Sequence, residues 1–254
     1  MKVFLDVGAH VGESLKPALD PRYRFDRIVC FEPVQACWAA LEGIADHRVE
    51  ICRFGLWKEE ENRSINDPGS LGASVHAEGS SRGRSEIVAL RQASGWFRDE
   101  LAEDDTVLLK LNCEGSECDI LDDLLRSGEI RKVDSALVDF DVRKVTGLAH
   151  REREVRERLD AAGYTGLLRL KEEHKGPTHT VTIDNWLREA GVTSTRPPAR
   201  WMWRYMWMPA AARLTIAVCK GMARRLLPRS AYGRLRRLVQ KRVFDYPPDV
   251  ESPG

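Results

Sequence analysis

Along most of the chain, short apolar runs alternate with segments whose apolar positions recur every three or four residues. The runs are typical of buried parallel strands, and the second pattern is typical of helices that pack on a sheet. This alternation predicts an α/β fold of the Rossmann-like kind, with a mostly parallel, doubly wound sheet. Core strands are expected at residues 2–7, 27–31, 49–54, 106–111 and 135–140, with a short strand at 87–90. Helices are expected at residues 13–19, 35–44, 93–101, 118–127 and 152–162.

Two further segments flank the turn Lys175-Gly176-Pro177. Residues 164–170 and 178–183 look like strands, and the turn between them predicts a C-terminal antiparallel strand pair. A helix is expected at residues 184–190, closed by Gly191. The pattern therefore predicts one α/β domain over residues 1–195.

The composition changes after residue 195. Residues 196–254 contain 13 Lys and Arg side chains and three acids, whereas residues 1–195 contain 27 Lys and Arg side chains and 36 acids. The net charge of +1 therefore combines an acidic body with a strongly basic extension. A total of 254 residues fits one α/β domain with such an appendage.

The extension is rich in Trp and Arg, and two helices are expected within it, at residues 210–227 and 231–244. Aromatic residues beside basic amphipathic helices are typical of interfacial membrane helices. The hypothesis is that residues 201–244 bind an anionic membrane surface. Packing of these helices on the acidic body is the alternative, and specific nucleic-acid binding is disfavoured because no recognition motif accompanies the charge.

Three absences in the sequence set further expectations. The apolar run before Asp6 is too short for a signal peptide, and no run of about 20 apolar residues predicts a spanning helix. A cytoplasmic protein is therefore expected, with peripheral attachment at the inner face of the membrane if the extension binds lipid. No Cys/His cluster has zinc spacing, so no metal site is expected.

Glycines follow the first predicted strand in the segment FLDVGAHVGES. Gly8 and Gly12 allow a sharp turn and a close approach to a ligand, and the helix start that follows offers unpaired N–H groups. The spacing D-x-G-x-x-x-G differs from the G-x-G-x-x-G of pyrophosphate-binding turns. Asp6 would oppose a pyrophosphate but suits a cationic amino group, such as that of S-adenosylmethionine. A purely structural turn is the alternative.

An acid ends the second predicted strand. Glu32 comes twenty residues after Gly12 and is followed by Pro33. In dinucleotide-binding folds an acid in this place accepts hydrogen bonds from the ribose hydroxyls. Glu32 is therefore predicted to bind the ribose of a nucleoside cofactor, and a solvated strand end is the alternative.

Polar residues also follow the fourth core strand, in the segment LLKLNCEGSECDIL. Lys110, Asn112 and Glu114 are delivered to the carboxyl end of this strand, and Gly115 permits the turn into the next helix. Ligands in open α/β sheets bind at this edge, where the strand order reverses. Asn112 is therefore a candidate for cofactor binding and Glu114 for catalysis. The alternative for Glu114 is a helix-start acid that complements the helix dipole.

These three segments, in this order and spacing, resemble the FkbM-type methyltransferases, whose motifs read D-x-G-A-N-x-G, F-E-P and K-I-D-V-E-G-A-E. The resemblance covers about residues 3–185. It implies a class I methyltransferase fold, S-adenosyl-L-methionine as cofactor, and transfer of a methyl group to an oxygen. The acceptor would be a small molecule or a glycan, such as a sugar or a secondary-metabolite hydroxyl.

The resemblance also assigns residues to the cofactor site. It implies contacts from the glycine turn, the strand-end acid and the fourth-strand motif: Asp6, Gly8, His10, Gly12, Glu32, Pro33 and Asn112. The sequence departs from the family pattern at two of these positions. His10 stands where the family usually has Asn, and Asn112 stands where it usually has Asp, which removes a carboxylate near the methionine end.

A hydroxyl acceptor must also lose a proton, which a positioned carboxylate or histidine can accept. Glu114 and Asp139 are the catalytic candidates, because both follow core strands at the expected edge. Asp141 shares that edge, whereas His174 and His179 flank the predicted turn and are expected at the surface.

Two other functions stay open. A catalytically inactive cofactor-binding or scaffold protein of the same fold is favoured by Asn112 in place of Asp. A nucleotide-dependent oxidoreductase is disfavoured by the glycine spacing.

Overall fold

The computed structural model describes residues 1–66 and 85–191. The predicted extension 196–254, including the membrane-binding hypothesis for residues 201–244, lies outside the described residues and stays a prediction. Within the described ranges, none of the helices combines the length and the apolar character needed to cross a bilayer.

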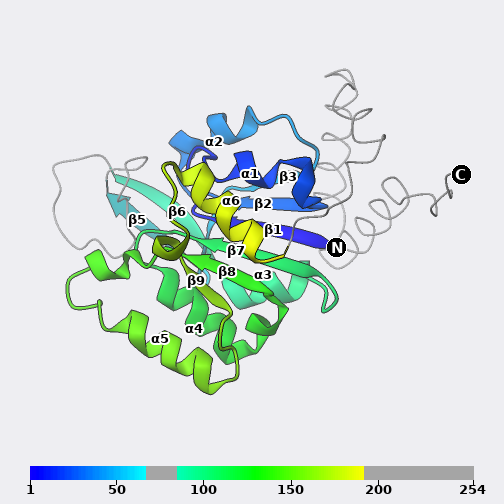
Figure 1. Ribbon diagram of the computed structural model, residues 1–254. Coiled ribbons are helices and arrows are strands. Elements are labelled where there is room, and N and C mark those ends of the chain that lie inside the picture. The colour runs from blue at the N-terminus through cyan, green and yellow to red at the C-terminus, as the bar shows by residue number, and fades with distance from the viewer. Residues whose placement is uncertain (67–84, 192–254) are drawn as a thin grey trace, which may run out of the picture. The chain divides into compact units, whose positions relative to one another are not determined.

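Six parallel strands form the main sheet, in the order β3-β2-β1-β7-β8-β9 (Figure 1). Their bounds are β1 Lys2–Val7, β2 Arg27–Phe31, β3 Val49–Cys52, β7 Thr106–Leu111, β8 Ser135–Val138 and β9 Leu168–Leu170. Three of the predicted core strands have the expected bounds, and the other two end two residues earlier than predicted. The predicted Rossmann-like α/β fold is therefore confirmed.

Helices cover both faces of this sheet (Figure 1). The helices are α1 Leu15–Ala18, α2 Gln35–Glu42, α3 Ala93–Glu100, α4 Glu117–Ser127, α5 Arg151–Ala161 and α6 His179–Glu189. Side chains in β1 alternate between two apolar clusters, because successive residues of a strand point to opposite faces. Val3, Leu5 and Val7 join the cluster that includes α3, α4 and α5, whereas Phe4 joins the cluster that includes α1, α2 and α6.

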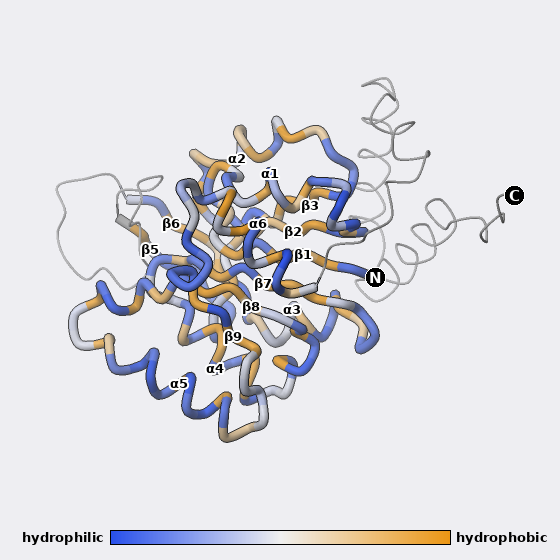
Figure 2. Tube along the Cα trace, in the orientation of Figure 1, coloured by the Kyte–Doolittle hydropathy of each residue, from blue (hydrophilic) through white to orange (hydrophobic). Residues whose placement is uncertain are grey.

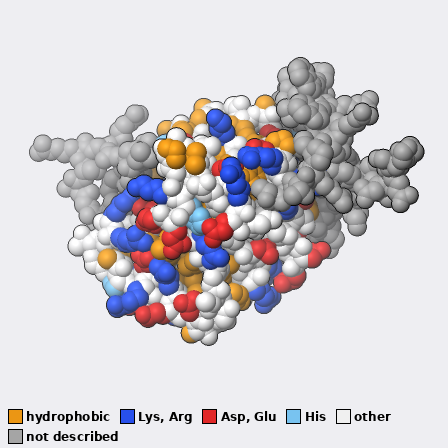
Figure 3. Space-filling model, viewed as in Figure 1, with side chains coloured by type: hydrophobic (Ala, Val, Ile, Leu, Met, Phe, Trp, Pro, Cys, Tyr) orange, Lys and Arg blue, Asp and Glu red, His pale blue; other side chains and the backbone are white. Residues whose placement is uncertain are grey.

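Apolar residues are concentrated along the central strands, whereas α5 is mostly hydrophilic (Figure 2). Only Val155 and Leu159 of α5 are buried, and its charged residues pair with neighbouring elements, as Arg158 does with Asp122 of α4. On the face shown in Figure 3, side chains of both signs are accordingly interspersed over this region. Such exposed pairs contribute little to stability, so the two buried residues are what holds α5 on the sheet.

The order of the strands places a ligand-binding edge between β1 and β7. From β1 the chain proceeds outward through β2 to β3, and then returns to add β7, β8 and β9 on the other side. The strand order therefore reverses between these two central strands, whose carboxyl ends lie side by side, with Val7 paired to Leu111. Ligands in open α/β sheets bind at this point.

A second sheet of three strands was not expected as a unit. It has the order β4-β6-β5, with bounds β4 Gly55–Trp57, β5 Glu61–Asn66 and β6 Ser85–Gln92. Buried Ile65, Val88 and Leu90 of this sheet pack with Val34 and with Cys37 of α2. The second sheet is thereby anchored beside the carboxyl end of β2.

The predicted C-terminal antiparallel strand pair is wrong. β9 pairs in parallel with β8, and the segment expected as its partner forms the first turns of α6. The Thr178 side chain accepts a hydrogen bond from the backbone N–H of Val181, which caps the helix. Ile183, Trp186 and Leu187 then fall on one buried face at helical spacing. Capping and tertiary burial therefore outweigh the β-branched composition of this segment.

Candidate functional site

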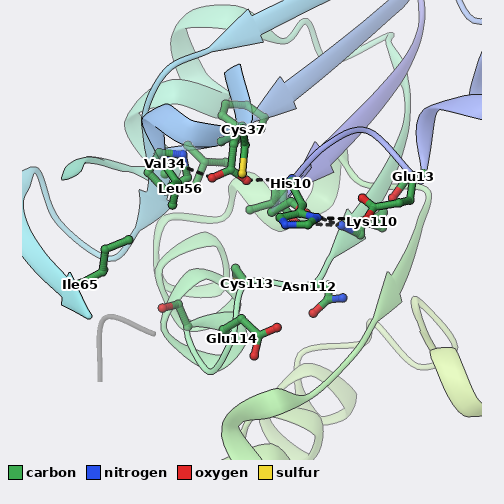
Figure 4. Close-up of a pocket in the computed structure, with 18 of the residues that line it drawn as sticks. His10, Glu13, Val34, Cys37, Leu56, Ile65, Lys110, Asn112, Cys113 and Glu114 are labelled. Carbon is green, nitrogen blue, oxygen red and sulfur yellow. Dashed lines mark hydrogen bonds and ion pairs between the residues drawn. The ribbon is translucent and has the colours of Figure 1, made fainter. Parts of the chain in front are cut away.

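A cavity of about 310 Å³ lies at the carboxyl ends of β1, β2 and β7 (Figure 4). The glycine turn after β1, the acid after β2 and the loop after β7 all contribute to its walls, as the sequence predicts. Of the predicted site residues, six line the cavity: Gly8, His10, Glu32, Pro33, Asn112 and Glu114. Asp6, Gly12 and Asp139 do not line it.

Gly8 brings the turn after β1 against the loop after β7. Its φ of +78° lies in the left-handed region, and its N–H donates to the carbonyl oxygen of Phe31 at 3.1 Å. A Cβ at this position would lie 1.8 Å from the carbonyl oxygen of Asn112. Only glycine therefore lets the two loops meet at the cavity. Gly12 has a different role, because its missing side chain leaves room for apolar Leu41 and Ile44 behind the turn.

Glu32 holds the walls of the cavity together. One carboxylate oxygen accepts the backbone N–H of His10 at 2.8 Å, and the other accepts that of Val34 at 2.8 Å. The side chain is nearly buried, and this burial raises the pKa of Glu32 despite the two N–H donors. Each carboxylate oxygen can accept a further hydrogen bond. Glu32 therefore offers two acceptors to a pair of neighbouring hydroxyls.

Asp6 is placed differently from the expectation. Its carboxylate is completely buried and pairs with the Lys110 ammonium at 2.9 Å, beneath the turn rather than at the cavity surface. Lys110 also donates to the carbonyl oxygen of Gly8 at 2.7 Å. The pair thus fixes the glycine turn, and Lys110, not Asp6, is the member that lines the cavity. The pattern D-x-G showed the acid but not its buried partner on the neighbouring strand.

We expect Lys110→Met to destabilise the protein by about 3–5 kcal/mol, because it leaves the Asp6 carboxylate buried without its cation. Asp6→Asn combined with Lys110→Met removes both charges and should recover a substantial part of that loss. Chemical unfolding of the single and double variants measures both effects. A double variant that is no more stable than Lys110→Met alone would show that the ion pair does not account for the loss.

The loop after β7 turns Glu114 toward the cavity in an unusual backbone conformation. Glu114 has a φ of +54°, a left-handed conformation that non-glycine residues seldom adopt. The buried carboxylate of Glu117 supports the loop, because it accepts the N–H groups of Cys113 at 3.0 Å and Gly115 at 3.1 Å. Burial, and next the charge of Asp141, raise the pKa of Glu114 to about 7. Such a carboxyl group can take up a proton near neutral pH.

Asn112 presents an unused acceptor beside the same loop. Its side-chain oxygen is buried and receives no hydrogen bond from the described residues. A buried acceptor without a partner is costly. The position of Asn112 on the cavity wall therefore favours a ligand that brings a hydrogen-bond donor.

The net charge on the cavity wall is negative. The carboxylates of Glu13, Glu32 and Glu114 line the cavity together with two lysines. Both lysines pair with acids that do not line it, Lys110 with Asp6 and Lys171 with Asp139. The lysine charges are thus largely compensated. Of the lining carboxylates, Glu13 contacts the His10 ring at 3.0 Å, and Glu32 accepts two backbone N–H groups. Asp139 compensates the charge of Lys171, and its carboxylate contacts Lys171 rather than lining the cavity.

His179 lies in the cavity wall, although the sequence pattern placed it at a surface turn. It begins α6, and its Nε2 is 3.1 Å from the hydroxyl of Ser14, which also lines the cavity. Burial, and next the nearby Lys110, lower the pKa of His179. His174 is buried away from the cavity and pairs with Glu189. The signal in the sequence for this placement of His179 is the N-cap residue Thr178, which marks a helix start where the pattern predicts a strand.

Apolar side chains close the cavity on the side of the second sheet. They are contributed by β2, α2 and the loop between them, and by all three strands of the second sheet: Phe31, Val34, Cys37, Leu56, Ile65 and Leu90. The sequence pattern does not predict this wall, because it does not indicate that the three short strands form a sheet. This apolar wall lies beside Glu32, and apolar surface of this kind suits a flat heterocyclic base.

The acids near the cavity are not arranged as a metal centre. Among residues 1–66 and 85–191, no three His, Cys, Asp or Glu side chains converge in a way that could hold a metal ion.

Comparisons with known proteins identify no family for this chain. No family model matches the sequence, and no curated protein matches it. Among solved structures, the chain is similar to Methyltransferase FkbM from Methylobacillus flagellatus KT, at 18% identity and a TM-score of 0.34. The similarity covers 50% of this chain and 29% of that protein, less than a third of its length. A likeness this weak carries no conclusion about function, and membership of the FkbM-type family stays a prediction.

Proposed function

We propose that the protein is an S-adenosylmethionine-dependent methyltransferase that acts on a hydroxyl group of a small molecule or glycan. The observation that carries this proposal is the position of Glu32. Its carboxylate lies in the cavity beside the glycine turn, with one free acceptor site on each oxygen for the two ribose hydroxyls of a nucleoside.

The charge of the cavity favours a cationic nucleoside over a dinucleotide. A pyrophosphate would face Glu32 and Glu114, and also Glu13, which contacts the His10 ring; it would find both lining lysines already paired with acids. Like charges at such short range cost several kcal/mol. A sulfonium cofactor reverses the sign of these interactions. The same observation disfavours the alternative of a nucleotide-dependent oxidoreductase.

The residues of the cavity fit S-adenosylmethionine in three parts. Glu32 would hold the ribose, the apolar wall around Leu56 and Leu90 would hold the adenine, and the unused oxygen of Asn112 would accept a hydrogen bond from the amino group. When bound, this cofactor supplies an electrophilic methyl group. Asp6 does not reach the cavity, so its part in cofactor binding would be to hold Lys110 in place.

Glu114 is the residue we assign to proton removal from the acceptor hydroxyl. Of the two catalytic candidates, it is the one that lines the cavity, and its raised pKa of about 7 suits a general base at neutral pH. Asp139 is instead paired with Lys171. Alignment of the hydroxyl by the surrounding walls can lower the barrier by several kcal/mol more.

Transfer of a labelled methyl group from S-adenosylmethionine to a panel of saccharides and phenolic or aliphatic alcohols tests this function. We expect label in an acceptor with the wild-type chain and a loss of at least about 100-fold with Glu114→Gln. Binding of the cofactor without transfer to any acceptor would favour the catalytically inactive alternative. Absence of both binding and transfer would refute the proposal.

A further inference from the structure

Ser14 and His179 meet at the cavity wall, and the proposed function uses neither of them. The Ser14 hydroxyl lies 3.1 Å from Nε2 of His179, and both residues line the cavity. Ser14 is only 2% exposed and precedes α1, but its side chain makes no capping hydrogen bond to that helix. The starts of α1 and α6 thus place a buried hydroxyl and an imidazole side by side in the wall of the cavity.

This pair can donate a hydrogen bond to a ligand without carrying a charge. Burial, and next Lys110, lower the pKa of His179, so its imidazole is neutral at pH 7 and has one N–H group. When that N–H group is on Nε2, it donates to the Ser14 oxygen, and the serine keeps its own proton for another acceptor. A carboxylate would favour this tautomer, because it only accepts hydrogen bonds.

The Ser14–His179 pair lies at a different end of the cavity from the apolar wall. Figure 4 shows Leu56 of the apolar wall on one side of His10, and Glu13 on the other. Ser14 follows Glu13 directly in the chain. This side, with Glu13, Ser14 and His179, is the polar end of the cavity. With its base against the apolar wall, a nucleoside would extend its 5′ substituent to the polar end.

The cavity wall offers acceptors as well as donors. The buried side-chain oxygen of Asn112 has no hydrogen-bond partner among the described residues, and the Glu13 carboxylate lines the cavity while it contacts the His10 ring. Glu13 would repel an anion that arrives alone. A group with an ammonium beside its carboxylate would meet both kinds of partner. An α-amino acid is such a group, and it is neutral as a unit, unlike a pyrophosphate.

We propose that the Ser14–His179 pair binds the carboxylate of the amino-acid part of S-adenosylmethionine, with Ser14 as the hydrogen-bond donor and His179 as its positioning residue. This inference rests on the proposed function, which assigns residues to the adenine, the ribose and the amino group but none to the carboxylate. It makes the cavity selective for nucleosides that carry a complete α-amino acid on the 5′ substituent.

Calorimetric titration with S-adenosylmethionine and with decarboxylated S-adenosylmethionine at pH 7 tests this inference. The two ligands share the adenosine, the sulfonium and the amino group, and they differ only in the carboxylate. On charge alone, the negative cavity wall would favour the decarboxylated ligand, which carries one positive charge more. We expect the opposite order, with S-adenosylmethionine bound at least about 10-fold more tightly by the wild-type chain, because the carboxylate gains a hydrogen bond to a charged acceptor.

Variants assign this preference to the pair. Ser14→Ala should lower the affinity for S-adenosylmethionine by about 10-fold to 100-fold and leave that for the decarboxylated ligand nearly unchanged. His179→Leu should have the same effect in weaker form, whereas His179→Gln, whose amide can still donate to the hydroxyl, should retain most of the preference. Ser127→Ala is the matched control, because Ser127 is exposed at the end of α4, where its hydroxyl donates to the carbonyl oxygen of Leu124.

The outcomes separate this inference from the proposed function. A variant that folds poorly loses affinity for both ligands and leaves their ratio unchanged. If the wild-type chain binds both ligands equally, or the decarboxylated one more tightly, the carboxylate site is refuted and the cofactor assignment stands. The same holds if Ser14→Ala keeps the full preference, and an unchanged preference in His179→Leu would remove His179 from the site. If neither ligand binds, the proposed function fails first, and the inference fails with it.

Discussion

Glu32→Gln lowers the affinity for S-adenosylhomocysteine by at least about 100-fold, because the ribose loses hydrogen bonds to a charged acceptor. Hydrogen bonds to charged groups contribute about 1.5–3 kcal/mol each, and two of them are affected. The glutamine amide can still accept through its oxygen, but its NH2 group would face either a backbone N–H or a ribose hydroxyl. Both carboxylate oxygens already hold backbone N–H groups, from His10 and Val34, so no orientation of the amide satisfies all partners.

Calorimetric titration of the wild-type and variant chains with S-adenosylhomocysteine measures this loss. Glu42→Gln is the matched control, since Glu42 lies at the exposed end of α2 and pairs with the exposed side chain of Arg53. Thermal unfolding of the same samples separates lost binding from lost folding. Equal affinities for Glu32→Gln and the wild type would remove Glu32 from the site and leave the cavity without its ribose acceptor.

Gly8→Ala should destabilise the protein by about 3 kcal/mol or more. Two costs combine at this position: a left-handed φ of +78°, which costs a non-glycine residue about 1–2 kcal/mol, and a Cβ placed 1.8 Å from the backbone oxygen of Asn112. The oxygen belongs to the backbone, so it cannot rotate away as a side chain can. The turn and the loop after β7 must therefore separate, which also opens the cavity.

Gly163→Ala provides the control for the backbone cost alone. Gly163 has a φ of +87°, and nothing lies within 4 Å of the Cβ it would gain. The Gly163→Ala variant should lose only about 1–2 kcal/mol of its free energy of unfolding, as measured by chemical unfolding. Equal losses for the two variants would show that the close approach of Gly8 to Asn112 does not exist in solution.

The sequence predicts the central sheet and the glycine turn because both depend on local patterns. Predominantly apolar runs such as residues 2–7 are typical of strands that are buried on both faces in a parallel sheet with helices on each side. Glu32 and Asn112 were placed correctly at the cavity, since the end of each core strand is visible as the end of an apolar run. Strand ends in a parallel sheet share one edge, so predicting the strands also predicts the site.

Features that depend on partners distant in sequence could not be predicted in this way. Asp6 was expected to face a ligand, but its partner Lys110 is 104 residues further on and becomes a neighbour only when β1 and β7 pair. His179 was expected at a surface turn because the β-branched composition around it favours a strand.

The most direct test of the central claim, that the cavity binds a positively charged nucleoside and not a pyrophosphate, is calorimetric titration of the full chain with S-adenosylmethionine and, separately, with NAD. We predict micromolar or tighter binding of S-adenosylmethionine at one site per chain, lost in Glu32→Gln, and no measurable binding of NAD. Binding of NAD with no binding of S-adenosylmethionine would contradict the claim, because the carboxylates of the cavity wall would then not determine which ligand enters.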